Sequence, residues 1–252
     1  MRYKIPLIMI VSLTLILCAS SQKKLEKQKA QDPQYQYNVG LVYLQNGSFE
    51  EAIKYFNRSL SLRPNFNLAL NALGLTYFMK GEFQNAVGYF EKCLQVSPNF
   101  TESRNYLGSV YQELGMLDKA EQEFRKAIAD ETYSSRELPY YNLARLYLTK
   151  GKDEEALELV ERSIELNNRM VMSLNLKGVL LERLNRIEEA IESYSKALQI
   201  APDDVNLNYN LAVVYFKADR REEAKSIFER IYSQVTDQEI KNKINEYLKV
   251  LK

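Results

Sequence analysis

The chain repeats one pattern with a period of 34 residues, and this period constrains its fold more than any other feature. Counted from Pro33, position 20 of every copy is alanine, and position 24 is a large apolar residue. These residues are Ala52, Ala86, Ala120, Ala156, Ala190 and Ala224 at position 20, and Phe56, Phe90, Phe124, Val160, Tyr194 and Phe228 at position 24. A period of this length indicates stacked helical hairpins, in which each hairpin leaves an apolar face that only its neighbour covers.

Small residues recur at two further positions of the repeat. Position 8 is glycine or alanine in each copy: Gly40, Gly74, Gly108, Ala144, Gly178 and Ala212. Small residues at positions 8 and 20 are expected to let two helix axes approach closely, while the side chain at position 24 fills the space beside them. Position 15 holds residue types that tolerate a positive φ angle: Gly47, Gly81, Gly115, Gly151, Asn185 and Asp219. We therefore expect a tight turn at this position, between the two helices of each repeat.

Together with a tyrosine at position 11 in five of the six copies, these residues resemble the tetratricopeptide repeat (TPR) family from residue 33 to about residue 238. The resemblance implies an all-α fold, a right-handed solenoid of six helix-turn-helix repeats. Gly108 and Ala144 are 36 residues apart, so two extra residues enter after the third repeat. The repeats then cover residues 33–66, 67–100, 101–136, 137–170, 171–204 and 205–236. Residues 237–252 carry apolar side chains at helical spacing and are predicted to form a capping helix.

Residues 1–20 have the pattern of an export signal. Arg2 and Lys4 provide a positively charged start, and a 13-residue apolar core follows from Ile5 to Leu17. A helix of this length spans about 20 Å, which is less than the roughly 30 Å of a hydrocarbon layer. We therefore expect an exported protein and no permanent transmembrane helix in this segment.

The sequence Leu15-Ile16-Leu17-Cys18 resembles the lipobox of bacterial lipoproteins. The resemblance implies that Cys18 carries a lipid, which would anchor the chain to a membrane. Leu17 departs from the pattern, in which a small residue precedes the cysteine, and ordinary cleavage after Ser20 is the alternative. Residues 21–32 are polar and charged, so we predict a tether between the leader and the repeats.

The composition argues against a catalytic or nucleic-acid-binding site. The chain has no histidine, the commonest general base and metal ligand, and its net charge is +1. The sequence contains no glycine-rich phosphate loop, zinc-ligand spacing or nucleophile motif. Adjacent acids such as Glu154 and Glu155 recur where second helices are expected to start, and negative charge there suits the helix dipole. We therefore predict no enzymatic activity, no cofactor or metal, and neither a nucleic acid nor a small molecule as partner.

In the TPR family the concave wall is built by the first helix of each repeat. The residues at the corresponding positions are mostly apolar in the first two repeats, and we predict that they form a protein-binding groove: Tyr37, Leu41, Leu44, Leu68, Leu75, Phe78 and Met79. An apolar patch at one end of a groove would fit a helix or strand of a protein partner. The alternative is that the curvature of the solenoid, or the tether, covers these side chains.

Every repeat also has an asparagine at position 5 or 6: Asn38, Asn71, Asn105, Asn142, Asn175 and Asn210. Side-chain amides can hydrogen-bond the backbone of an extended peptide, so this set is a second candidate for partner binding. In related TPR proteins the asparagine is at position 6, which Asn38, Asn142 and Asn210 match. The other three are displaced by about 100° around the helix.

The export signal, the lipidation motif, the short tether and the six repeats resemble the type IV pilus pilotin family, as does the irregular junction from Asp130 to Ala144. The resemblance implies a non-catalytic lipoprotein on the periplasmic face of the bacterial outer membrane, which helps secretin subunits to reach the membrane and to form multimers. The groove would bind a secretin segment, and Cys18 would provide the anchor. The alternative is a soluble periplasmic or membrane-tethered adaptor for another envelope complex, such as cell-wall enzymes.

Overall fold

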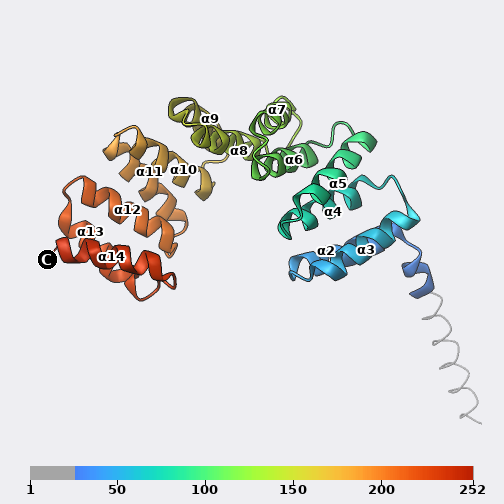
Figure 1. Cartoon of the computed structure of the whole chain (residues 1–252), viewed down its shortest axis with the longest axis horizontal. Helices are drawn as coiled ribbons and strands as arrows, with labels where there is room; N and C mark the ends of the chain where they lie inside the picture. The colour runs from blue at the N-terminus through green and yellow to red at the C-terminus, as the bar shows by residue number, and fades with distance from the viewer. Residues whose placement is uncertain (1–25, 252) are drawn as a thin grey trace, which may run out of the picture. The chain divides into compact units, whose positions relative to one another are not determined.

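The computed structural model describes residues 26–251, in which all regular secondary structure is helical. Residues 26–30 are helical, and helices α2 to α14 follow in chain order (Figure 1). Their bounds are α2 Pro33–Gln45, α3 Phe49–Leu62, α4 Asn67–Met79, α5 Phe83–Val96, α6 Thr101–Glu113, α7 Leu117–Ile128, α8 Glu137–Thr149, α9 Asp153–Leu166, α10 Val171–Arg183, α11 Ile187–Ile200, α12 Val205–Lys217, α13 Arg221–Tyr232 and α14 Gln238–Val250. The all-α fold class predicted from the repeat pattern is confirmed.

The starts of the helices follow the sequence pattern closely. α2, α4, α6, α8, α10 and α12 each begin at the first residue of a predicted repeat, and α14 lies within the predicted capping segment. Aspartate side chains cap three of these helices; the Asp237 carboxylate, for example, accepts hydrogen bonds from the backbone N–H groups of Glu239 and Ile240, at 2.7 and 3.2 Å. Such caps satisfy backbone donors that have no partner inside the helix.

The turns between paired helices have the predicted left-handed backbone. All six residues at position 15 have a positive φ angle, from 57° at Asp219 to 77° at Gly81. Asn185 and Asp219 replace glycine in the last two turns, which is consistent with the tolerance of these two residue types for this conformation.

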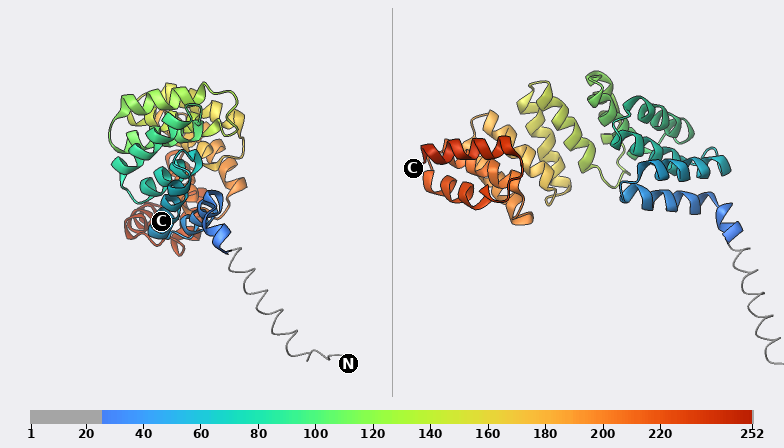
Figure 2. Two further views of the ribbon diagram at one scale, coloured as in Figure 1. Left: turned by 90° about the vertical axis from the view of Figure 1, so that its right-hand side faces the viewer. Right: turned by 60° about the horizontal axis from the view of Figure 1, so that its bottom comes forward.

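The helices form two compact units, of which the first ends at Leu114 and the second begins at Gly115. This boundary falls in the turn of the third predicted repeat, so α6 belongs to the first unit and α7 to the second. Figure 2 shows the helices of each unit side by side in chain order. Within a unit, the first helix of a repeat packs against its own second helix and against the second helix of the preceding repeat.

The core of each hairpin contains the residues that the period singled out. The side chains at positions 20 and 24 are completely buried in all six repeats. Gly40, Gly74 and Gly178 lie directly against the aromatic ring at position 24 of the same repeat. A Cβ atom added to Gly74 would lie 2.6 Å from the Phe90 ring, which is closer than a real contact allows. The predicted close approach of the two helices is therefore confirmed.

The two ends of the described chain are both packed. α14 closes the last hairpin, because Ile244 and Leu251 are buried in one cluster with Phe228. At the other end, the Gln36 amide donates hydrogen bonds to the carbonyl oxygens of Lys29 and Ala30, at 3.4 and 3.3 Å. The part of the predicted tether that the structure describes is helical over residues 26–30, and Lys29 and Ala30 are bonded to α2.

The predicted export signal, the lipidation site Cys18 and residues 21–25 of the tether lie outside the described residues. None of the helices within residues 26–251 combines the length and the apolar character that a membrane span requires.

The same substitution at two helical glycines is expected to have opposite effects on stability. Gly74→Ala should lower the free energy of unfolding by about 1–3 kcal/mol, because the new methyl group meets the buried Phe90 ring. Gly88→Ala should raise it by about 0.5–1 kcal/mol, because the added Cβ has no atom within 4 Å other than those of the adjacent residues and the local helix backbone, and alanine favours the helix. Urea unfolding of the two variants measures both values, and equal shifts would contradict the packing described here.

Candidate functional site

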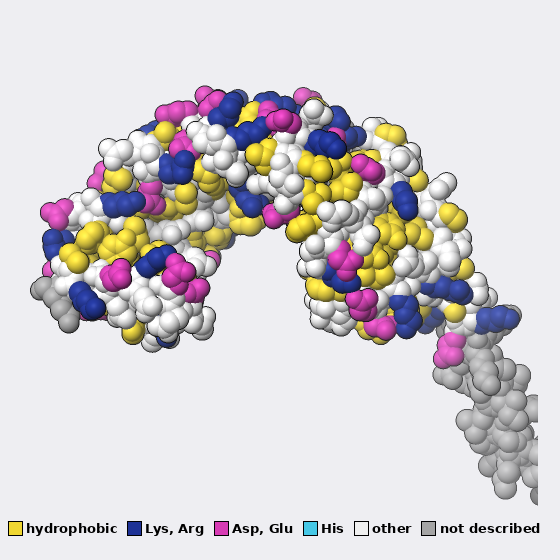
Figure 3. All heavy atoms as spheres, viewed as in Figure 1, with side chains coloured by type: hydrophobic (Ala, Val, Ile, Leu, Met, Phe, Trp, Pro, Cys, Tyr) yellow, Lys and Arg dark blue, Asp and Glu magenta, His cyan; other side chains and the backbone are white. Residues whose placement is uncertain are grey.

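The predicted groove residues lie on α2 and α4, the first helices of the first two repeats. Met79 is the most exposed of them, at 53%, and the others except Leu44 are partly buried. Tyr37, Leu41 and Leu75 also pack against the apolar core between these repeats. Figure 3 shows hydrophobic side chains gathered over this part of the first unit. The result is an apolar surface, and several of its side chains are held in place by the core on which they pack.

Leu44 is not part of this surface, and its assignment to the groove is a correction to the sequence analysis. Only 8% of this residue is exposed, because it lies in the core cluster with Ala52, Phe56 and Leu73. Its counterpart in the second repeat, Phe78, stays partly exposed and contacts the ring of Phe83, with ring centroids 6.0 Å apart.

Ring contacts hold Tyr37, an aromatic residue of the predicted groove, in place. The Tyr37 ring lies 5.9 Å from the Phe56 ring and 5.5 Å from the Phe66 ring, measured between centroids. Burial raises the pKa of the Tyr37 hydroxyl, and the carboxylate of Glu102 on α6 raises it further. Tyr37 is therefore a neutral side chain with a hydroxyl that can donate a hydrogen bond.

Two of the six asparagines are buried and cannot contact a partner. The Asn71 amide donates to Glu102 Oε1 at 3.2 Å and accepts from the Ser103 hydroxyl at 2.7 Å. Asn105 is also buried. The predicted ladder of six amides is therefore wrong at Asn71 and Asn105, whose side chains lie in the packed interior.

The other four asparagines are at least partly exposed, and three of them lie in the second unit. Asn142, Asn175 and Asn210 belong to α8, α10 and α12, the first helices of three consecutive repeats. The Asn210 amide donates a hydrogen bond to Asn175 Oδ1 at 3.0 Å. In the first unit, Asn38 accepts a hydrogen bond from the Gln34 amide at 3.0 Å. The predicted amide ladder is thus reduced to these four side chains.

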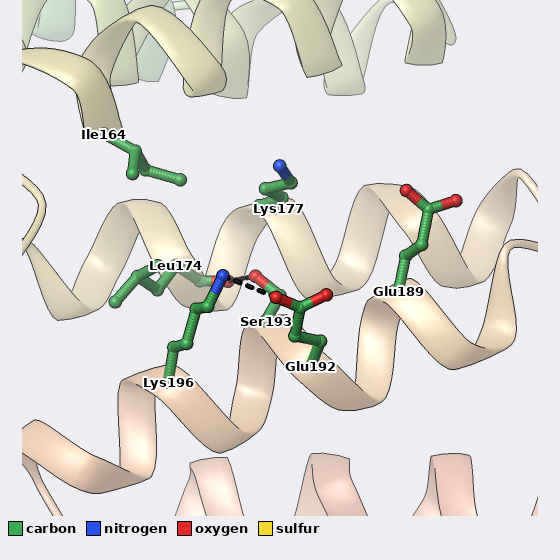
Figure 4. A pocket seen from close by; sticks show the side chains of 7 residues that line it. All are labelled: Ile164, Leu174, Lys177, Glu189, Glu192, Ser193 and Lys196. Carbon is green, nitrogen blue, oxygen red and sulfur yellow. Dashed lines mark hydrogen bonds and ion pairs between the residues drawn. The ribbon is translucent and has the colours of Figure 1, made fainter.

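A small pocket between α9, α10 and α11 is lined mainly by charged side chains of these helices (Figure 4). Lys196 pairs with Glu192 at 2.6 Å, and Lys177 pairs with Glu161 at 2.6 Å. The Ser193 hydroxyl donates to the backbone carbonyl of Leu174 at 2.8 Å. These contacts stabilise the packing of the three helices. Within residues 26–251, no three potential metal-ligating side chains of the types His, Cys, Asp or Glu are grouped.

A larger cleft lies between α12 and α14, where the sequence analysis predicted only a cap. We call it the C-terminal cleft; its volume is about 520 Å³, and it is lined by Tyr209, Phe216, Lys243, Glu246, Tyr247 and Val250. Val250, at the edge of the cleft, is 58% exposed.

Comparison with known families identifies the repeats. Residues 118–246, or 129 of the 252 residues, match the model described as "Tetratricopeptide repeat protein 21 C-terminal ARM domain". Residues 32–99 and 89–122 match two further models, each described as "Tetratricopeptide repeat".

Among curated proteins, the chain is similar to a UDP-N-acetylglucosamine–peptide N-acetylglucosaminyltransferase of Giardia intestinalis, with 29% identity over 113 residues. The match covers 42% of this chain and 8% of the transferase. The chain spans only between 8% and 14% of the length of the curated relatives that it matches.

Two solved structures are similar to this chain over nearly their whole length. One, described in a functional characterisation of Pseudomonas aeruginosa PilF, has a TM-score of 0.76 and 20% identity, and the match covers 88% of this chain and 99% of PilF. The other is PilW, described as a "widely conserved type IV pilus biogenesis factor", with a TM-score of 0.77 and 14% identity. That match covers 84% of this chain and 97% of PilW. At these identities the likeness is one of fold.

Proposed function

Because the chain belongs to the tetratricopeptide-repeat family, whose models match residues 32–122 and 118–246, we propose that it is a non-catalytic scaffold that acts as a pilotin in type IV pilus assembly. In this role it is an outer-membrane lipoprotein that binds secretin subunits and assists their localisation and multimerisation. The observation that carries the proposal is the match to PilF and PilW, which extends over almost the full length of both proteins. The leader pattern and the lipidation motif before the repeats support the same role.

The proposed mechanism uses binding alone. Met79, Phe78 and Leu68 provide exposed or partly exposed apolar surface on the first unit, and a secretin segment would cover it. A large apolar side chain that passes from full exposure to full burial contributes about 1.5–3 kcal/mol, and the cost of association is subtracted from the sum of such contacts. A lipid on Cys18 would keep the bound subunit at the membrane.

The role in secretin assembly is tested by deleting the gene and examining secretin multimers on a gel. We expect multimers to be lost, to return with the wild-type gene, and to stay depleted with Met79→Glu, which places a charge on the apolar surface. Met116→Glu is the matched control, because Met116 is also exposed, at 44%, but lies at the start of the second unit. Normal multimers in the deletion strain would rule out the pilotin role.

The anchor is tested separately with labelled palmitate. We expect the wild-type protein to incorporate the label and the Cys18→Ser variant to lose it, since the thiol is the acceptor. An unlabelled wild-type protein would show that the leader is processed in another way and that no lipid on Cys18 anchors the protein to the membrane.

A further inference from the structure

We infer that the C-terminal cleft is a second docking site, which binds a partner segment carrying a bulky apolar side chain next to a lysine or arginine. The inference rests on the proposed function as a protein-binding scaffold, and it adds a site in the second unit with its own preference. The partner is a peptide segment of another protein, and three features of the cleft specify its chemistry.

The first feature is a floor of fixed aromatic rings. The Tyr247 ring stacks on the buried Phe228 ring and meets the Phe216 ring edge-on, both at 5.0 Å between centroids. The Tyr209 ring also contacts Phe228, at 6.1 Å. Because these rings support one another, the cleft keeps its shape when empty, and little ordering is required on binding. Pockets with aromatic walls are where apolar anchor residues bind most strongly.

The second feature is a pair of hydroxyl groups without protein partners. Within residues 26–251, neither the Tyr209 nor the Tyr247 hydroxyl forms a hydrogen bond with another residue, although both side chains are partly buried. Burial raises the pKa of the Tyr209 hydroxyl, so that it remains a donor. Carbonyl oxygens of a peptide backbone are suitable acceptors for both groups.

The third feature is an uncompensated negative charge. Two charged residues line the cleft, and the Lys243 ammonium is already paired with Glu239 at 2.7 Å. Glu246 has no ion pair with any described residue. Figure 3 shows hydrophobic side chains along α12 and α14 bordered by charges of both signs. A lysine or arginine beside the apolar anchor of the partner would complement Glu246.

The test measures peptide binding by fluorescence anisotropy with the full chain in lipid nanodiscs. The probes are three labelled dodecapeptides with a central phenylalanine flanked by two lysines, two glutamines or two glutamates. We expect the lysine peptide to bind about fivefold more tightly than the glutamine peptide, and the glutamate peptide to bind more weakly than either. The differences should shrink as salt is added. Equal affinity of the three peptides would overturn the inference.

Variants place the binding in the C-terminal cleft. Glu246→Lys should reverse the charge preference, and Val250→Asn should weaken all three peptides because it puts a neutral polar group on the apolar edge. Glu229→Lys is the matched control, since Glu229 is exposed on α13 and is not among the lining residues. Circular dichroism checks that each variant is folded. An unchanged preference in Glu246→Lys, or the same reversal in Glu229→Lys, would contradict the assignment.

The outcome can be separated from that of the proposed function. Met79→Glu should leave peptide binding unchanged, because Met79 belongs to the first unit. If the peptides fail to bind but secretin assembly still depends on Met79, the C-terminal cleft is not a docking site and the pilotin role stands. If the peptides bind with the expected preference and secretin assembly proceeds without the protein, only the pilotin role fails. Sedimentation showing a dimer that Glu246→Lys dissociates would mean that the occupant is a second copy, which would also overturn the inference.

Discussion

Replacing Phe90 by alanine is expected to lower the free energy of unfolding by about 3–5 kcal/mol, the largest loss we predict for a single substitution. Phe90 is completely buried at position 24 of the second repeat, with Gly74 against its ring. Its ring also stacks on Tyr106 of α6, with centroids 5.8 Å apart. Truncation therefore opens a cavity where α4, α5 and α6 meet, and the neighbouring helices cannot fill it without losing their own contacts.

Urea unfolding followed by circular dichroism measures this loss. Phe83→Ala is a matched control, because Phe83 lies at the start of the same helix but is only partly buried. We expect it to cost less than half as much as Phe90→Ala. If both variants lost the same stability, position 24 would not have the special role in the hairpin core that its complete burial indicates.

The parts of the fold that the sequence predicts are those that recur. Ala86 and Phe90 have equivalents in every repeat, so their role in packing can be recognised from the period, and the structure confirms it. Gly81 and Asp219 are predictable for a similar reason, because the turn requires a positive φ angle wherever it occurs. A structural requirement that recurs in every repeat selects similar residue types at the same position of each repeat.

The candidate site was harder to predict, because it depends on how neighbouring repeats cover one another. Leu44 and Met79 are both apolar and both lie near the end of a first helix, yet one is buried and the other is exposed. Asn71 is buried because Ser103 and Glu102 of the next first helix bind its amide. Contacts of this kind join residues that differ between repeats, so no periodic signal marks them.

A second set of contacts between repeats makes stability depend on pH. The carboxylate of Glu121 on α7 accepts hydrogen bonds from Lys150 at 2.8 Å, from the Tyr147 hydroxyl at 2.7 Å and from Arg125 at 3.0 Å. Burial by itself raises the pKa of Glu121, but these three donors outweigh it and lower the pKa from 4.5 to about 2. Tyr147 lies on α8 and Lys150 caps its C-terminal end, so the carboxylate joins the third repeat to the fourth.

This lowered pKa predicts a loss of stability in acid. The contribution of Glu121 is complete above pH 4.5, where the carboxylate is ionised in both the folded and the unfolded chain, and it is lost as pH falls towards 2. The difference in pKa corresponds to about 3 kcal/mol, and we expect about 2 kcal/mol because the side chain is 24% exposed. Glu121→Gln should therefore be less stable than wild type by this amount at pH 7, and the gap should close as pH approaches 2.

Urea midpoints measured between pH 7 and pH 2 follow this convergence directly. The control is Glu165→Gln, which removes a carboxylate from the exposed ion pair with Arg162 and should change stability by less than about 0.5 kcal/mol. A gap between wild type and Glu121→Gln that stays constant down to pH 2 would show that the loss comes from altered packing. If this difference in stability closes, and Glu165→Gln is as stable as wild type throughout, the acid sensitivity of this junction comes from the Glu121 carboxylate and its three donors. Protonation removes the negative charge that attracts Lys150 and Arg125.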